Sequence, residues 1–331
     1  MSINISIWGK ALRTVLKMSD EEFKALDPVA QWLVATRSAV FLMTFFSAVI
    51  GGLLAAADHA FSWPKFLLCA LGLVLAHATN NLVNDYTDAA RGVDKDNYFR
   101  TLYGPQVVEM GLWSKKKMRT VIACTGLLAA LCGFGLFLMS GIGVIWLTLI
   151  GAFFVMCYTW PLKYIGLGEL TVLLVWGPLM VAGTYFTMAG HWSWKIAAIG
   201  AVYAIGPTTV LFGKHTDKLP EDKKKGIHTL PVLLGEPKAR AAVIGMLVAQ
   251  PLLVTLFVLT GWLKFPMLIF LLGIPAIMTA AKVFTKPRPT SRPKEFPAAH
   301  WPTYLAGTAF VANRVTGGLF ALGLLLSLLV K

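Results

Sequence analysis

Nine stretches of about twenty mainly apolar residues restrict what this 331-residue chain can fold into. The hydrocarbon core of a bilayer is about 30 Å thick, so a helix needs roughly 20 apolar residues to cross it. A segment in lipid must satisfy its own backbone hydrogen bonds, which favours helices. We therefore expect an all-α, polytopic membrane bundle of about nine transmembrane helices. The expected spans are residues 33–56, 66–84, 119–140, 143–160, 168–189, 193–213, 241–261, 263–284 and 303–330.

The composition supports a membrane protein. Only 14% of the residues are charged, whereas a soluble domain carries about 25%. The formal net charge of +14 would suggest a nucleic-acid partner in a soluble protein. Here the basic residues cluster in short segments between apolar spans, which is typical of the positive-inside rule, so we expect a lipid bilayer and no nucleic acid as partner. The four cysteines lie inside apolar stretches without metal-ligand spacing, and we expect no metal or redox role for them.

The distribution of charge predicts the orientation. With nine spans, 24 of the 30 Lys and Arg residues fall on one side of the membrane and four on the other. The positive-inside rule then places the amino terminus and both long polar segments, residues 85–118 and 214–240, in the cytoplasm. We expect one domain over residues 1–331 in the cell (inner) membrane, with residues 1–32 as a cytoplasmic amino-terminal segment.

The second expected span ends in a polar face. His77, Asn81, Asn84, Asp85 and Asp88 are three or four residues apart, so they share one side of a helix. An ionised carboxylate at membrane depth costs about 2.5–3.5 kcal/mol, and such residues usually mark a functional site. Two carboxylates one turn apart repel each other unless a cation lies between them, and oxygen ligands suit Mg²⁺. The alternative is a helix end that is polar because it meets water.

A second acidic cluster follows the sixth span on the same predicted side, with Asp217 and Glu221 four residues apart. Two such clusters would hold Mg²⁺ around one diphosphate and neutralise the charge that develops as the diphosphate leaves. A diphosphate also needs direct polar and cationic contacts. The candidates for these contacts are Asn81, Asn84, Arg91, Lys95, Lys163, Lys214 and His228.

Four stretches carry a resemblance to a known family. They are Asn84-Asp85-Tyr86-x-Asp88-xxx-Gly92-x-Asp94, Tyr158-Thr159-x-Pro161-Leu162-Lys163-Tyr164, Gly177-Pro178-xxxx-Gly183-Thr184-Tyr185 and Gly226-xx-Thr229-Leu230. With them the chain resembles the UbiA superfamily of intramembrane prenyltransferases over about residues 33–285, and within it the 1,4-dihydroxy-2-naphthoate polyprenyltransferases of the menaquinone pathway. It departs from that branch where residues 212–217 replace an Asn-Asn-x-Arg-Asp run.

The resemblance implies a nine-helix enzyme that transfers a prenyl or polyprenyl group from its diphosphate to an aromatic quinone precursor, with Mg²⁺ as cofactor. It identifies Asp94 and Asp222 as further metal ligands, beside Asp85, Asp88, Asp217 and Glu221. The catalytic carboxylates would be Asp85, Asp88, Asp217 and Asp222. Aromatic faces can stabilise an allylic cation, and the expected pocket for the acceptor or the isoprenoid tail contains Tyr158, Tyr164 and Tyr185.

Three other functions are compatible with the sequence. A membrane terpene cyclase of the same superfamily ionises a prenyl diphosphate without an acceptor, and the altered second motif permits that activity. A secondary transporter with broken helices fits the number of spans, but it does not predict two acidic clusters on one side of the membrane. A non-catalytic assembly protein fits a second cluster that has lost its function.

Overall fold

The computed structural model describes residues 3–93 and 104–330, and this part of the chain contains helices and no strand. All nine expected spans occur in it as helices. Eight helical runs are long and apolar enough to cross a membrane, and the remaining span is the shorter apolar helix Gly143–Cys157. The predicted all-α membrane bundle is therefore confirmed.

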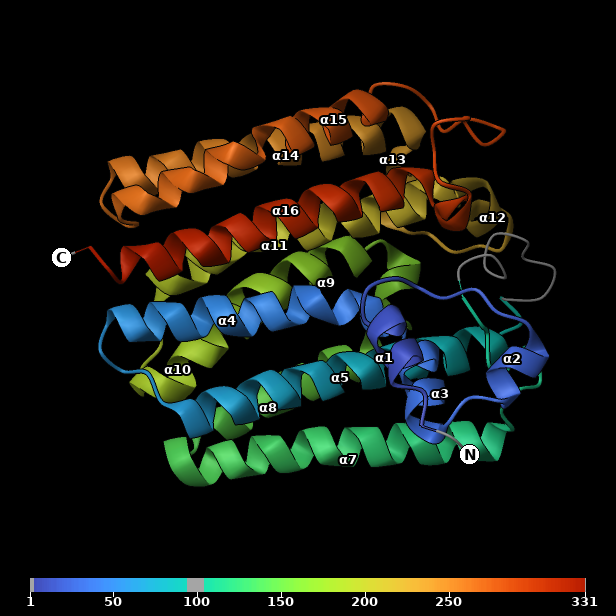
Figure 1. Ribbon diagram of the computed structural model, residues 1–331, viewed down its shortest axis with the longest axis horizontal. Helices are drawn as coiled ribbons and strands as arrows, with labels where there is room; N and C mark the ends of the chain where they lie inside the picture. Colours follow the sequence, from blue (N-terminus) through green and yellow to red (C-terminus); the bar gives the residue numbers. More distant parts are fainter. Residues whose placement is uncertain (1–2, 94–103, 331) are drawn as a thin grey trace.

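The amino-terminal half of the bundle holds four spans: α4 (Phe41–Ala57), α5 (Trp63–Ala90), α7 (Lys115–Ser140) and α8 (Gly143–Cys157). The fifth span is a continuous run of α9 (Gly168–Leu174), η3 (Val175–Ala182) and α10 (Gly183–Ala189). The remaining spans are α11 (Trp194–Asp217), α14 (Glu236–Leu259), η4 with α15 (Phe265–Gly273 and Ile274–Phe284) and α16 (Tyr304–Ser327). The long helices lie roughly side by side along the longest axis of the molecule (Figure 1).

One end of the bundle carries the short helices, and we call it the polar end. It contains α1 (Ile5–Ala11), α2 (Asp20–Lys24), α3 (Pro28–Ala35), α12 (Leu219–Lys224) and α13 (Leu230–Leu234), on the right in Figure 1. The short 3₁₀ turns η1 (Ser38–Val40), η2 (Leu162–Ile165) and η5 (Ala298–His300) complete the described elements. Helices α5 and α11 both end there, so the polar ends of two spans from different halves of the chain meet at one end of the bundle.

The fifth span changes its helix type at its centre. Pro178 lies inside η3, which is a π-helix. Proline has no backbone N–H and its ring crowds the preceding turn, and such local widening of a helix is frequent at functional sites. Next to it, a Cβ on Gly177 would lie 2.6 Å from the carbonyl oxygen of Gly200 on α11. The two glycines therefore let the fifth and sixth spans pack at backbone contact.

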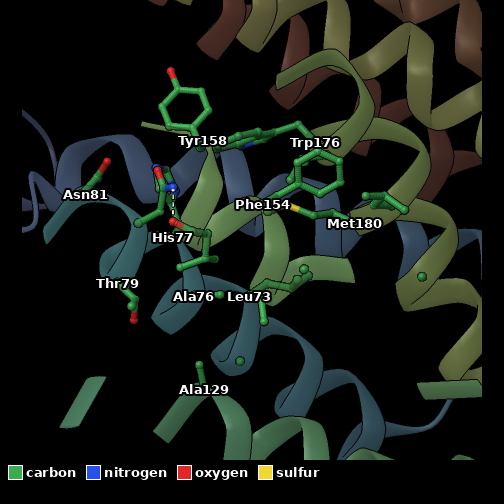
Figure 2. A pocket seen from close by; sticks show the side chains of 18 of the residues that line it. Leu73, Ala76, His77, Thr79, Asn81, Ala129, Phe154, Tyr158, Trp176 and Met180 are labelled. Atoms are coloured by element: carbon green, nitrogen blue, oxygen red, sulfur yellow. Dashed lines mark hydrogen bonds between the residues drawn. The ribbon is translucent and has the colours of Figure 1, made fainter. Parts of the chain in front are cut away.

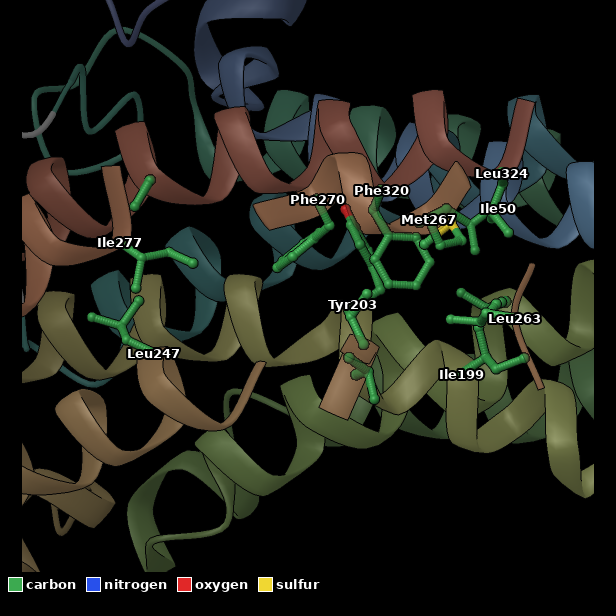
Figure 3. Packing of buried hydrophobic residues seen from close by; sticks show 14 of the residues in the cluster. Ile50, Ile199, Tyr203, Leu247, Leu263, Met267, Phe270, Ile277, Phe320 and Leu324 are labelled. Carbon is green, nitrogen blue, oxygen red and sulfur yellow. The ribbon is translucent and has the colours of Figure 1, made fainter. Parts of the chain in front are cut away.

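The main apolar core lies in the carboxyl-terminal half. It surrounds Tyr203 of α11 and Phe320 of α16, whose rings are 6.2 Å apart, and Phe270 of η4, which is 6.0 Å from Phe320 (Figure 3). The Tyr203 hydroxyl donates a hydrogen bond to the backbone oxygen of Met43 on α4, 2.6 Å away. This bond joins the core to the amino-terminal half.

Helices α7 and α8 are less covered by the rest of the chain. Their exposed side chains are large and apolar, and they include Leu131, Phe134, Trp146, Leu149 and Phe153. A continuous apolar surface of this kind would be a liability in water, whereas in a bilayer it contacts lipid tails. The protein is thus a multi-pass membrane protein with α7 and α8 at its periphery.

The amino-terminal segment packs as a small separate core at the polar end. Phe23 and Trp113 meet edge to face with their centroids 6.2 Å apart. Asp27 is the N-cap of α3 and accepts hydrogen bonds from the backbone N–H of Asn4, Val29 and Ala30. These contacts hold residues 3–35 against the start of α7.

Candidate functional site

A cavity of about 460 Å³ opens between the two halves of the bundle. Its walls are mostly apolar, and α7 and α8 contribute small residues such as Gly126, Ala129, Gly151 and Ala152. Figure 2 shows Phe154, Tyr158 and Trp176 on one side of the cavity, with Ala129 on the other. The charged and amide side chains in the lining come from the polar end of the bundle: Arg37, Asn80, Asn81, Asn84 and Lys214. A long apolar chain with a charged head group matches this division.

The polar face predicted on the second span forms one side of α5. The helix continues to Ala90, beyond the expected end of the span at residue 84, and Asp85 and Asp88 lie on it as their spacing predicts. His77, Asn84, Asp85 and Asp88 are all buried. The Asn84 amide donates to the Thr159 hydroxyl at 3.0 Å, so α5 is fixed against the segment that follows α8.

Both carboxylates of α5 contact buried cations. The Arg37 guanidinium lies 3.0 Å from Asp85 Oδ1. Lys163 Nζ donates to both oxygens of Asp88, at 3.0 and 2.8 Å. Removing one partner of a buried ion pair costs about 3–5 kcal/mol, because the other charge is left unpaired. Electrostatic attraction therefore holds Asp85 beside Arg37, which lines the cavity, and Asp88 beside Lys163.

The backbone of Arg37 is unusual, since its φ of 55° lies in the left-handed region. Such a conformation costs about 1–3 kcal/mol in a residue other than glycine, and it clusters at functional sites. The guanidinium also donates to the backbone oxygen of Asn81 at 3.2 Å. Its contacts with α5 hold the residue in this conformation, between α3 and α4.

The second acidic cluster is divided between two helices, since Asp217 ends α11 whereas Glu221 and Asp222 lie on α12. Lys218 Nζ donates to Asp222 Oδ1 at 2.8 Å, and both side chains are buried. The other oxygen of Asp222 and Oε2 of the neighbouring Glu221 are buried without a hydrogen-bond partner in the described part of the chain. Unpaired buried carboxylate oxygens are costly, and two of them on adjacent residues suit a hard cation that binds oxygen.

Asp217 is placed differently. Its Oδ1 accepts from the backbone N–H of Leu305 at 3.0 Å, and its Oδ2 accepts from that of Ala306 at 2.9 Å. Arg288 Nε is 3.5 Å from Oδ1. Both carboxylate oxygens thus hold the amino-terminal turn of α16, where the helix dipole favours an anion. This geometry favours a structural role for Asp217.

The described residues contain no group of three or more His, Cys, Asp or Glu side chains that is close enough to hold a metal ion. Asp94 and Lys95 lie outside the described residues. The predicted metal ligands that the structure describes, apart from Asp217, are the carboxylates of Asp85 and Asp88 on α5 and those of Glu221 and Asp222 on α12.

The other residues that were predicted to contact the diphosphate lie in different parts of the polar end. Lys214 lines the cavity, and the Asn81 amide donates to the Thr36 backbone oxygen at 2.8 Å. Arg91 is exposed and stacks over the rings of Trp160 and Tyr164, with centroid distances of 5.2 and 5.0 Å. His228 is exposed on the segment between α12 and α13.

Of the three tyrosines predicted for the pocket, Tyr158 lines the cavity, whereas Tyr164 and Tyr185 are not among its lining residues. The Tyr185 hydroxyl donates to Asp58 Oδ2 at 2.6 Å. Asp58 follows the end of α4 that is remote from the polar end. Tyr185 therefore joins helices at the opposite end of the bundle.

One ion pair near the site could not be anticipated from the sequence. His215 Nδ1 lies 2.5 Å from Glu169 Oε1, with both side chains buried, and the second oxygen of Glu169 accepts from the Leu230 backbone N–H at 3.3 Å. This pair joins α9, α11 and α13, but its members are 46 residues apart, so no spacing signal exists. The Lys218–Asp222 pair has the i, i+4 spacing of a helical ion pair, which was a usable signal.

Comparison with known proteins gives consistent results. Residues 44–303 match the model of the UbiA prenyltransferase family. The chain is 32% identical over 241 residues to 1,4-dihydroxy-2-naphthoate octaprenyltransferase of Mycobacterium tuberculosis, covering 70% of this chain and 80% of that protein. It is 29% identical over 266 residues to the Escherichia coli protein of the same name, covering 76% and 83%.

Solved structures show the same fold. A UbiA homolog from Archaeoglobus fulgidus bound to GPP and Mg²⁺ aligns with a TM-score of 0.59 at 15% identity, over 91% of this chain and all of that chain. The apo structure of a UbiA homolog from Aeropyrum pernix aligns with a TM-score of 0.58 at 16% identity, over 87% and 97%.

Proposed function

The chain belongs to the UbiA prenyltransferase family, and we propose that it transfers a polyprenyl group from its diphosphate to an aromatic acceptor of the 1,4-dihydroxy-2-naphthoate class. We propose that this reaction depends on Mg²⁺ and takes place within the membrane. The names of the M. tuberculosis and E. coli relatives support the acceptor class. The A. fulgidus homolog, with GPP and Mg²⁺ bound, supports the donor and the metal. We further propose that the polar end faces the cytoplasm, as the charge distribution predicts.

One observation in the structure carries the proposal: Arg37, Asn81, Asn84 and Lys214 line the polar part of a mainly apolar cavity, and the carboxylates of Asp85 and Asp88 lie beside it, in contact with Arg37 and Lys163. Asp85 and Asp88 on α5 and the unpartnered oxygens of Glu221 and Asp222 on α12 would hold the metal. When bound, Mg²⁺ neutralises charge on the diphosphate and makes it a better leaving group. Asp217 is left out of this set, because both of its oxygens cap α16.

The basic side chains beside the carboxylates would stabilise the diphosphate as it leaves. Lys163 and Arg37 lie within contact distance of the α5 carboxylates, and Lys214 lines the same cavity. As the bond between the allylic carbon and the diphosphate oxygen breaks, the electron pair leaves with the diphosphate. Positively charged groups that are already in place stabilise this developing negative charge without reorganisation.

The apolar part of the cavity would hold the isoprenoid and exclude water. The small residues of α7 and α8 leave room for the chain, and the faces of Phe154, Tyr158 and Trp176 are suited to a carbocation. A ring carbon of the acceptor then forms the new C–C bond, and the group it replaces, a proton or a carboxyl group leaving as CO₂, departs. Exclusion of water prevents hydrolysis of the reactive carbon.

The test uses the purified protein in lipid nanodiscs with labelled octaprenyl or geranylgeranyl diphosphate, 1,4-dihydroxy-2-naphthoate and Mg²⁺. We expect a prenylated naphthalene product by mass spectrometry, its loss with EDTA and its recovery when Mg²⁺ is added back. Asp88→Asn is the matched inactive control. A cyclised hydrocarbon formed without an acceptor would instead identify a terpene cyclase and overturn the proposed transfer.

A further inference from the structure

The residues that line the cavity include one histidine, His77, which lies at a distance from the carboxylates of Asp85 and Asp88. His77 lines the cavity and lies on the same face of α5 as Asp85. The two residues are eight positions apart, which corresponds to about 12 Å along a helix that rises 1.5 Å per residue. His77 therefore lies well beyond direct contact with a diphosphate bound at the carboxylates.

The imidazole is held from three sides. Its Nδ1 is 2.8 Å from the Thr44 hydroxyl of α4. The Trp176 ring of η3 meets it edge to face with centroids 5.1 Å apart, and the Phe41 ring lies 5.4 Å away. The bond to Thr44 uses Nδ1, and Nε2 forms no hydrogen bond with another described residue. The ring is thus fixed in orientation, with one polar nitrogen left for a ligand.

Nε2 of His77 is not among the buried side-chain atoms that lack a hydrogen-bond partner, so it is open to the cavity that His77 lines. Leu73, Ala76 and Met180, labelled in Figure 2, are apolar lining residues of the same cavity. A ligand that fills the cavity displaces water from Nε2 and must replace the lost hydrogen bond, so we expect it to carry a hydrogen-bonding group on an otherwise apolar body.

We infer that His77 Nε2 accepts a hydrogen bond from a ring hydroxyl of the aromatic acceptor, in the tautomer whose Nδ1–H donates to Thr44, and thereby selects hydroxylated rings. This inference rests on the proposed function and adds the residue that recognises the acceptor. The separation of about 12 Å along α5 leaves room for the reacting allylic carbon and one aromatic ring between the diphosphate and the imidazole. Thr44, Trp176 and Phe41 act as positioning residues, because they touch the imidazole.

The experiment combines a variant with a substrate analogue. Wild type and His77→Phe are each given a hydroxylated naphthalene acceptor and its O-methyl ether, with the same polyprenyl diphosphate and Mg²⁺. A site built to bind a hydroxyl discriminates against an analogue that lacks it, and a lost hydrogen bond corresponds to about a tenfold change. We expect the preference of wild type for the hydroxylated acceptor, measured as a ratio of kcat/KM values, to exceed the preference of His77→Phe about tenfold.

If His77 had only a structural role, wild type and His77→Phe would show the same preference for the hydroxylated acceptor. The bulk of the methyl group would then lower kcat/KM by the same factor in both proteins. His77→Gln retains a hydrogen-bonding side chain, and we expect it to keep part of the preference even if His77→Phe fails to fold. The KM for the prenyl diphosphate should stay unchanged in both variants. Tyr203→Phe is the matched control, because it loses a buried hydrogen bond to α4 outside the cavity, and its preference should equal that of wild type.

Two outcomes overturn the inference in distinguishable ways. If wild type and the His77 variants show the same preference for the hydroxylated acceptor, His77 does not bind the hydroxyl, while the proposed transfer stands. If wild type turns over the prenyl diphosphate but prenylates no hydroxylated ring, the proposed function fails, and the acceptor role of His77 fails with it.

Discussion

A substitution of Asp217 distinguishes most clearly between a structural and a catalytic carboxylate. Its spacing in the sequence is that of a metal ligand, whereas in the structure both of its oxygens accept backbone N–H groups at the start of α16. We predict that Asp217→Asn lowers the stability of the protein and leaves the turnover of the folded molecules nearly intact.

The magnitude follows from the contacts. Asparagine keeps one acceptor oxygen, so the variant loses one of the two bonds to α16, at 2.9–3.0 Å. It also loses the negative charge that faces the helix dipole and Arg288. A hydrogen bond to a charged group contributes about 1.5–3 kcal/mol, and an anion at a helix start adds up to about 1–2 kcal/mol. We expect a loss of about 2–4 kcal/mol in the free energy of unfolding.

The assay pairs two measurements on the same preparation in lipid nanodiscs: unfolding by denaturant and turnover per folded molecule. Glu221→Gln is the matched comparison, since its buried Oε2 has no hydrogen-bond partner among the described residues. We expect this variant to stay within about 0.5 kcal/mol of wild type and to lose turnover. An Asp217→Asn protein with wild-type stability and no turnover would refute the structural role and restore Asp217 as a metal ligand.

Two further changes test the packing of the site. We expect Lys163→Met to lower the free energy of unfolding by up to about 3–5 kcal/mol, because Asp88 loses a buried cationic partner, and to weaken prenyl diphosphate binding. A denaturation curve and a binding isotherm check both effects, and unchanged values would argue against the pair. Gly177→Ala places a Cβ 2.6 Å from the Gly200 carbonyl oxygen and should destabilise the protein by about 1–3 kcal/mol. Gly245→Ala, which has open space at its Cβ, should be neutral or stabilising. Equal shifts in Tm for the two variants would contradict the close approach of the fifth span to α11.

The sequence predicted the membrane spans well, because about twenty apolar residues in a row leave a chain few options in lipid. The polar face of α5 was also predictable, since spacings of three and four residues are local. The break at Pro178 could be read as a helix disturbance, but its π-helical form depends on how the fifth span packs against α11.

The partners of the carboxylates were much harder to predict. Lys163 lies 75 residues from Asp88, and Arg37 lies 48 residues from Asp85, so only the folded bundle shows the pairing. The role of Asp217 depends on the start of α16, 88 residues away. Local spacing identifies which residues are polar at membrane depth, whereas the fold decides which of them face a ligand and which hold a helix.

We propose that carboxylates from α5 and α12 hold one diphosphate through Mg²⁺. A double-mutant cycle measures whether they do, from the binding of a non-reactive prenyl thiolodiphosphate to wild type, Asp85→Asn, Asp222→Asn and the double variant. Groups that share one ligand are coupled by about 0.5–3 kcal/mol, whereas independent sites add within about 0.5 kcal/mol. We predict a coupling of more than about 1 kcal/mol in Mg²⁺ that disappears in EDTA. Additive effects in Mg²⁺ would contradict the claim.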